Sequence, residues 1–183
     1  MTKVVLTFGV LAGVIMAALV WIVAWLCERD MIQFERTAYV GYASMLIALT
    51  MVFFGIKSYR DNFNNGKITF WQGIKVGLLI SLIAGVFYFA GGFSYNLANP
   101  GFQAKFMQKY AEQTVDKLRQ EGAPQAKIDA AQAEIDMMQK LFENPLGFFA
   151  IAMVEILPVG LVVTLISSAL LRRKELLPAA AAA

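Results

Sequence analysis

Four long apolar segments dominate the pattern of hydrophobic and polar positions along the chain. They cover about residues 4–26, 39–56, 74–95 and 146–171. A helix needs roughly 20 predominantly apolar residues to cross a bilayer, and each segment is long enough to do so. The pattern therefore predicts an all-α membrane protein, with a single domain of four transmembrane helices over residues 1–174.

A polar segment, at about residues 100–143, separates the third and fourth apolar segments. Each half of it carries one apolar stripe at helical spacing, and Gly122, Ala123 and Pro124 break the pattern between the halves. The first stripe consists of Phe106, Tyr110, Thr114 and Leu118, and the second of Ile128, Ala131, Ile135, Met138 and Phe142. Two helices with one stripe each predict an antiparallel helical hairpin outside the bilayer. Asn-Pro pairs at 99–100 and 144–145 are expected to start its first helix and the fourth span.

The ends of the chain and the basic residues set the expected topology. The first apolar segment exceeds the roughly 7–15 apolar residues of a signal peptide, so we interpret it as a true span. Residues 175–183 are excluded as a tail that is either non-native or disordered. Four spans place both termini and the 57–67 loop on one side, where short segments beside the spans carry Lys3, Lys57, Arg60, Lys67, Lys75, Arg172, Arg173 and Lys174. Dense juxtamembrane basic residues mark the inside, which predicts cytoplasmic termini and a periplasmic hairpin in a bacterial inner membrane.

Composition narrows the range of functions. The chain has 183 residues, of which 58% are hydrophobic and 16% charged, whereas soluble domains average about 25% charged. The net charge of +3 sits beside apolar segments and suits lipid headgroups rather than nucleic acid. The chain has no histidine and one cysteine, Cys27, and it shows no nucleophile–base pair or metal-ligand spacing. We therefore expect a protein that is not an enzyme and needs no metal or cofactor.

Glu155 is the candidate functional residue within the spans, together with Pro158. A charged side chain at the bilayer centre costs about 2.5–3.5 kcal/mol, so it usually faces protein or water, or is protonated. One interpretation is structural, with Glu155 protonated or paired with Tyr88, Thr164 or Ser81. The other is a proton or cation site, because Pro158 leaves the carbonyl of Val154 free one turn away. The sequence shows no second charge within the spans, which weakens a proton relay.

Small residues recur at four-residue steps on three of the spans. The third span carries Gly73, Gly77, Ser81 and Gly85; the first carries Gly9, Gly13 and Ala17; the fourth carries Gly160, Thr164 and Ser168. Such stripes let helices approach closely. They predict helix packing within one monomer, a seam between copies, or docking onto a larger complex, and the spacing does not distinguish these.

Several segments in combination resemble a known family. They are GIKSYRDNFNNGKITFWQGIKVGLLISLIAG (55–85), Asn99-Pro100-Gly101-Phe102, Asn144-Pro145-Leu146 and EILPVGLVVTLISSALLRRK (155–174). The chain up to Lys174 resembles the small bacterial membrane proteins catalogued as domain of unknown function 4199. The resemblance implies four spans with an extramembrane helical segment before the last. It implies no activity, and although Glu155, Pro158 and Gly160 match the family pattern, it assigns them no role.

The expected function is that of a structural or accessory membrane protein. Its partners would be membrane lipids, further copies of itself or a larger inner-membrane complex. The alternative is a small transporter, or an ion- or proton-handling protein, that uses Glu155.

Overall fold

Six α-helices make up the part of the chain that the computed structural model describes, residues 1–172, and no strand occurs there. They are α1 (Thr2–Glu28), α2 (Phe34–Phe63), α3 (Phe70–Ala98), α4 (Phe102–Gln120), α5 (Gln125–Glu143) and α6 (Pro145–Arg172). Four of these helices, α1, α2, α3 and α6, are long and apolar enough to cross a membrane. The protein is thus an all-helical, multi-pass membrane protein. Arg173, Lys174 and the predicted tail at 175–183 lie outside the described residues.

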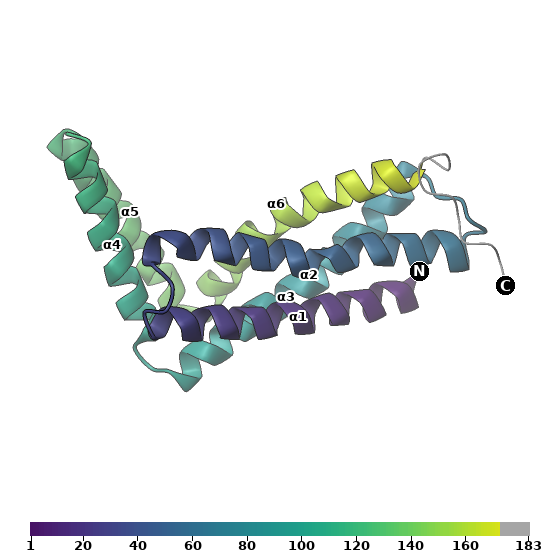
Figure 1. The fold of residues 1–183 in the computed structure, drawn as a ribbon, viewed down its shortest axis with the longest axis horizontal. Helices are drawn as coiled ribbons and strands as arrows, with labels where there is room; N and C mark the ends of the chain where they lie inside the picture. Colours follow the sequence, from purple (N-terminus) through teal and green to yellow (C-terminus); the bar gives the residue numbers. More distant parts are fainter. Residues whose placement is uncertain (173–183) are drawn as a thin grey trace.

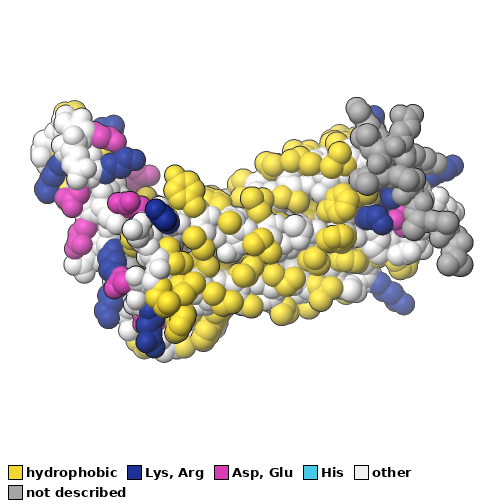
Figure 2. All heavy atoms as spheres, in the orientation of Figure 1, with side chains coloured by type: hydrophobic (Ala, Val, Ile, Leu, Met, Phe, Trp, Pro, Cys, Tyr) yellow, Lys and Arg dark blue, Asp and Glu magenta, His cyan; other side chains and the backbone are white. Residues whose placement is uncertain are grey.

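The four apolar helices form an elongated bundle, and α4 and α5 lie at one end of it (Figure 1). Helix α3 is central, because it packs most extensively against α1 and then against α6. The core is made of buried aliphatic side chains from all four helices, among them Met16, Leu49, Ile80 and Ile156. Figure 2 shows an apolar surface along the bundle, with charged side chains gathered at its two ends. That distribution fits a bundle surrounded by lipid.

The helices extend beyond the apolar segments that predicted them. The clearest case is α2, which covers Phe34–Phe63 where the apolar segment covers 39–56. Charged residues at its ends continue the helix because no proline or glycine interrupts the backbone hydrogen bonds there. The chain then turns through Asn65 and Gly66, which both have positive φ, as the Asn-Gly pair predicts. A capping box between Thr69 and Gln72 starts α3.

The two Asn-Pro pairs behave differently. Asn144 accepts a hydrogen bond from the backbone N–H of Leu146, and α6 starts at Pro145 as predicted. The prediction for Asn99 and Pro100 was wrong, because α4 starts at Phe102 and Gly101 is its N-cap. Gly101 has a φ of 91°, a left-handed conformation that lets the chain turn sharply after α3.

Helices α4 and α5 lie side by side at one end of the bundle (Figure 1). On α5 the predicted stripe faces inward, with Ile128 and Ile135 buried. On α4 the predicted stripe was partly wrong: Met107 and Val115 are the buried residues, and Tyr110 is 39% exposed. Steps of four residues drift around a helix with 3.6 residues per turn, so a strict four-residue stripe cannot stay on one face.

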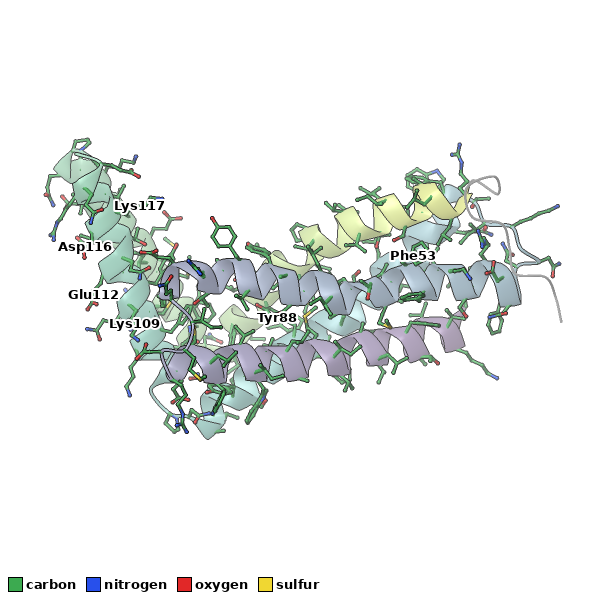
Figure 3. The ribbon with its side chains drawn as sticks, in the orientation of Figure 1. Phe53, Tyr88, Lys109, Glu112, Asp116 and Lys117 are labelled. Carbon is green, nitrogen blue, oxygen red and sulfur yellow. The ribbon has the colours of Figure 1, made fainter. Side chains whose placement is uncertain are left out.

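A chain of aromatic rings attaches α4 to the bundle. The rings of Trp21, Tyr95, Phe102, Phe106 and Phe34 contact one another in this order, with centroids 4.9–6.0 Å apart. At the base of α4, Lys109, labelled in Figure 3, forms an ion pair with Asp30 in the α1–α2 loop. These contacts link α4 to α1, α2 and α3 at once.

Candidate functional site

Glu155 accepts a hydrogen bond from Tyr88 across the α3–α6 interface. The Tyr88 hydroxyl lies 2.7 Å from Oε2 of Glu155, and Figure 3 shows Tyr88 midway along the bundle. The other two partners considered from the sequence take different positions. Ser81 donates to the carbonyl of Gly77 on its own helix. Thr164 is nine residues beyond Glu155, half a turn out of phase, and is buried against α3 on the opposite face of α6.

The Glu155 side chain lies on the outer surface of the monomer and not in its core. It is ten residues from the start of α6, or about 15 Å along the helix axis. On this surface it is surrounded by apolar side chains, such as Val154, which is 72% exposed. In a bilayer this position faces lipid. One carboxylate with a phenol donor is therefore presented to the membrane interior.

Pro158 lies on the same exposed side of α6, which continues through it without a break. Proline has no backbone N–H, so the carbonyl of Val154 loses its usual helical donor. The surface around Glu155 therefore has two oxygen acceptors, the carboxylate and this carbonyl, one turn apart. Together they can accept hydrogen bonds or hold a cation.

The small-residue stripes of α3 and α6 face each other within the monomer. A methyl group added to Gly73 would meet Ser168, one added to Gly77 would meet Thr164, and Ser81 lies against Gly160 in the same way. Gly85 continues the stripe and approaches Met153 and Ile156 of α6. This close approach leaves the hydroxyls of Thr164 and Ser168 buried without a hydrogen-bond partner among the described residues. The α3 stripe therefore packs inside one chain.

The small residues of α1 also pack inside the chain, but against large side chains of α3. Gly9 lies under Ile83, and Gly13 lies under the ring of Phe87. Ala17 approaches Gly91. Helix α3 thus packs against α6 through one face of small residues and against α1 through another face.

Arg60 is a buried charged residue that sequence reasoning missed. From the sequence it was counted only among the basic residues beside the spans, whereas its side chain is 1% exposed. Its Nε donates to Oδ1 of Asp61 at 2.6 Å, and its Nη1 donates to the carbonyl of Leu171 at 3.2 Å. Lys57 lies 3.3 Å from the other Asp61 oxygen. The available signal was the Lys57–Asp61 spacing of four residues, with Arg60 beside it.

Arg60 connects α2 to the last turn of α6. The carbonyls at a helix C-terminus carry partial negative charge, so a guanidinium there is favourable. Leu171 is in that last turn, and its side chain is also buried. The interaction joins two helices at the end of the bundle where the N-terminus lies. It is a structural site, separate from Glu155.

The described residues contain no group of three or more histidine, cysteine or acidic side chains that could hold a metal ion. Cys27 is buried, and its Sγ lies 3.2 Å from the Thr37 hydroxyl. Near it, Tyr95 donates to Glu28, and Trp21 donates to Ser94. These bonds tie the ends of α1, α2 and α3 together, which is a structural role.

Comparison with protein families gives one match. The family model described as "Protein of unknown function (DUF4199)" matches residues 7–173, which is nearly the whole chain. No match is found among curated proteins or among solved structures.

Proposed function

Since the chain belongs to the DUF4199 family, whose description assigns no activity, we propose a function from the geometry of the monomer. The protein is a non-enzymatic structural or accessory component of a bacterial inner membrane. It associates laterally with another membrane protein, either a second copy or a larger complex. The observation that carries this proposal is the position of Glu155 on the lipid-facing surface, where Tyr88 provides its hydrogen bond.

The energetic reasoning starts from the cost of a carboxylate in lipid. A charge at the bilayer centre costs about 2.5–3.5 kcal/mol on insertion scales. The hydrogen bond from Tyr88 offsets only part of this cost, because an ionised carboxylate has about four acceptor sites and this bond fills one of them. A neighbouring helix with a donor or cation would cover the carboxylate and the free carbonyl of Val154 together. Lateral association therefore stabilises the exposed face of α6.

The small-residue stripes of α3 and α6 pack against each other inside the monomer. This packing supports the surface around Glu155 as the site of association. The α3 and α6 stripes face each other, so they are not available to a partner. What remains exposed next to Glu155 on α6 is Val154 and Pro158. We place the partner on this face of α6.

The proposed topology has the termini in the cytoplasm and α4 and α5 outside the bilayer on the periplasmic side. Helices α4 and α5 carry the charged side chains at one end of the molecule (Figure 2). A Cys27→Ser chain with a single cysteine at Ala126 tests this. In intact cells, a membrane-impermeant maleimide should label that cysteine. A cysteine that stays unlabelled would contradict the proposed topology and indicate the reverse orientation.

Co-purification tests the lateral association. The protein would be extracted from native membranes in a mild detergent, separated by size exclusion, and its co-eluting proteins identified by mass spectrometry. We expect a stoichiometric assembly for the natural chain and its loss for Glu155→Leu. Glu134→Leu on α5, away from this face, serves as the control and should keep the assembly. A natural chain that elutes as a bare monomer would contradict the proposal.

A second candidate function is the handling of protons or cations by Glu155. It is favoured by the carboxylate–phenol pair beside the carbonyl that Pro158 leaves free. Purified protein in liposomes would then conduct protons or a monovalent cation, and Glu155→Gln would abolish the flux. A flux that Glu155→Gln leaves unchanged would exclude this candidate.

A further inference from the structure

A groove lies between α1 and α2 at the end of the bundle that holds the N-terminus. Its volume is about 390 Å³, and its lining comes from Phe8 of α1 and from Met51, Phe54, Lys57, Ser58, Asp61 and Asn62 of α2. The lining is divided along α2. Apolar side chains lie on the part nearer the bundle centre, and polar side chains lie in the last two turns. A groove that is apolar at one end and polar at the other matches an amphipathic ligand.

The polar end of the groove presents a partly exposed lysine ammonium, that of Lys57. Asp61 is shared between two cations, because it accepts from Nε of Arg60 at 2.6 Å and lies 3.3 Å from Nζ of Lys57. Arg60 is buried, whereas Lys57 is 39% exposed and has three donors, of which Asp61 takes one. Lys57 is therefore the cation that the groove presents to a ligand.

Neutral donors surround this ammonium. The Ser58 hydroxyl accepts from the Asn62 amide at 3.2 Å, which leaves the hydroxyl proton and the second amide proton free to donate. An ammonium, a hydroxyl and an amide together are suited to the oxygens of a phosphate diester. The negative charge of the phosphate would also be favourable beside the Lys57 ammonium.

The charged side chains around the groove are mostly basic. Among the described residues, this end of the molecule carries one acidic side chain, Asp61. Its basic side chains are Lys3, Lys57, Arg60, Lys67, Lys75 and Arg172. Each lysine or arginine near a membrane surface adds about 1 kcal/mol of attraction to anionic lipid. A zwitterionic headgroup would also bring an amine, and Asp61 is already engaged with Lys57 and Arg60.

We propose that this groove binds one anionic phospholipid, with the phosphate at Lys57, Ser58 and Asn62 and an acyl chain along Phe8, Met51 and Phe54. Lys57 directly follows the predicted apolar segment at 39–56, so it lies at the depth of the headgroups. The acyl chain then runs inward along the apolar part of the groove. The proposal is independent of the Glu155 face.

Native mass spectrometry with a defined lipid tests the site. The purified protein would be titrated with phosphatidylglycerol and, in parallel, with phosphatidylcholine. We expect one phosphatidylglycerol to remain bound at detergent and collision conditions that remove phosphatidylcholine. Lys57→Gln should weaken that binding about fivefold, the equivalent of one lysine contact. Lys67→Gln, at an exposed lysine of the same end that does not line the groove, should weaken the binding less than Lys57→Gln does.

One further variant and two soluble phosphate compounds complete the test. Met51→Trp fills the apolar part of the groove and should displace the lipid while all charges remain. Inorganic phosphate and glycerol 3-phosphate should give no thermal shift at concentrations where the lipid raises the melting temperature. Equal loss of binding with Lys57→Gln and Lys67→Gln would show general surface attraction and overturn the proposal. A full thermal shift with free phosphate would overturn the assignment to a lipid.

Discussion

The Tyr88 hydroxyl lies 2.7 Å from Oε2 of Glu155, joining two residues 67 positions apart in the chain. Tyr88 comes from the central helix α3, and Glu155 comes from the exposed side of α6. The bond holds a carboxyl group at one rotamer on a surface that is otherwise apolar. The bond also keeps this polar group at one position on the α6 surface.

Removal of the Tyr88 hydroxyl should destabilise the monomer modestly. Tyr88→Phe removes the donor and leaves the ring in place, so we expect a loss of about 0.6–1.5 kcal/mol in the free energy of unfolding. Tyr42→Phe is the control, because the Tyr42 ring is exposed on α2. Thermal unfolding in detergent would measure both. If Tyr88→Phe lost no more stability than Tyr42→Phe, the 2.7 Å bond would contribute nothing.

Alanine at Gly77 should weaken the α3–α6 interface. The added methyl would lie 2.6 Å from Cγ2 and Oγ1 of Thr164, a stiff and fully buried side chain. Overpacking of this kind costs about 1–3 kcal/mol. Gly41→Ala on α2 has open space around the new methyl and should stabilise the helix by about 0.5–1 kcal/mol. Unfolding measurements on the two variants should therefore change in opposite directions.

Loss of the Arg60 side chain should be the most damaging single change discussed here. Arg60→Met leaves Asp61 with one partner fewer and removes the guanidinium from the Leu171 carbonyl. Breaking a buried ion pair costs about 3–5 kcal/mol. Lys67→Met, at an exposed lysine of the same end, should cost little. In the Arg60→Met/Asp61→Asn double variant the loss should be smaller than the sum of the two single losses, and strict additivity would show that the pair is not coupled.

The contact between α4 and the α1–α2 loop should depend on pH. The hydrogen bond to Asp30 raises the pKa of Lys109 above its usual value. A raised lysine pKa gives stability that is complete below the unfolded pKa, about 10.4, and is lost as the pH rises through the folded pKa. Lys109→Gln should therefore melt below the natural chain at pH 8, and the difference should close above the folded pKa. Lys105→Gln, at an exposed lysine on the same helix, is the control and should leave the melting temperature at pH 8 close to that of the natural chain.

Hydropathy located the four spans, but it did not locate the helix ends. The apolar segment at 39–56 marks where α2 meets lipid, whereas the helix continues to Phe63 because helical hydrogen bonding does not depend on polarity. The same limit explains why the burial of Arg60 was not predicted. A basic residue shortly after an apolar segment is expected in water, whereas Arg60 is buried and donates a hydrogen bond to α6, from the far end of the chain.

The candidate site was located in part. One carboxylate within an apolar segment identified Glu155, and Tyr88 was among three partners that the sequence allowed. The choice between Tyr88, Ser81 and Thr164 depends on the rotation of α6 about its own axis. That rotation is set by the contacts of Gly160, Thr164 and Ser168 with α3. It turns Thr164 inward and Glu155 outward.

The sequence by itself determined that four segments enter the membrane and that two amphipathic helices come between the third and the fourth. Transfer free energy adds residue by residue along a segment, so a local stretch contains all the information that it needs. Only the tertiary structure decided which face of each helix is covered and which distant residues meet. Those outcomes depend on close packing between segments far apart in the chain, and no local stretch contains that information.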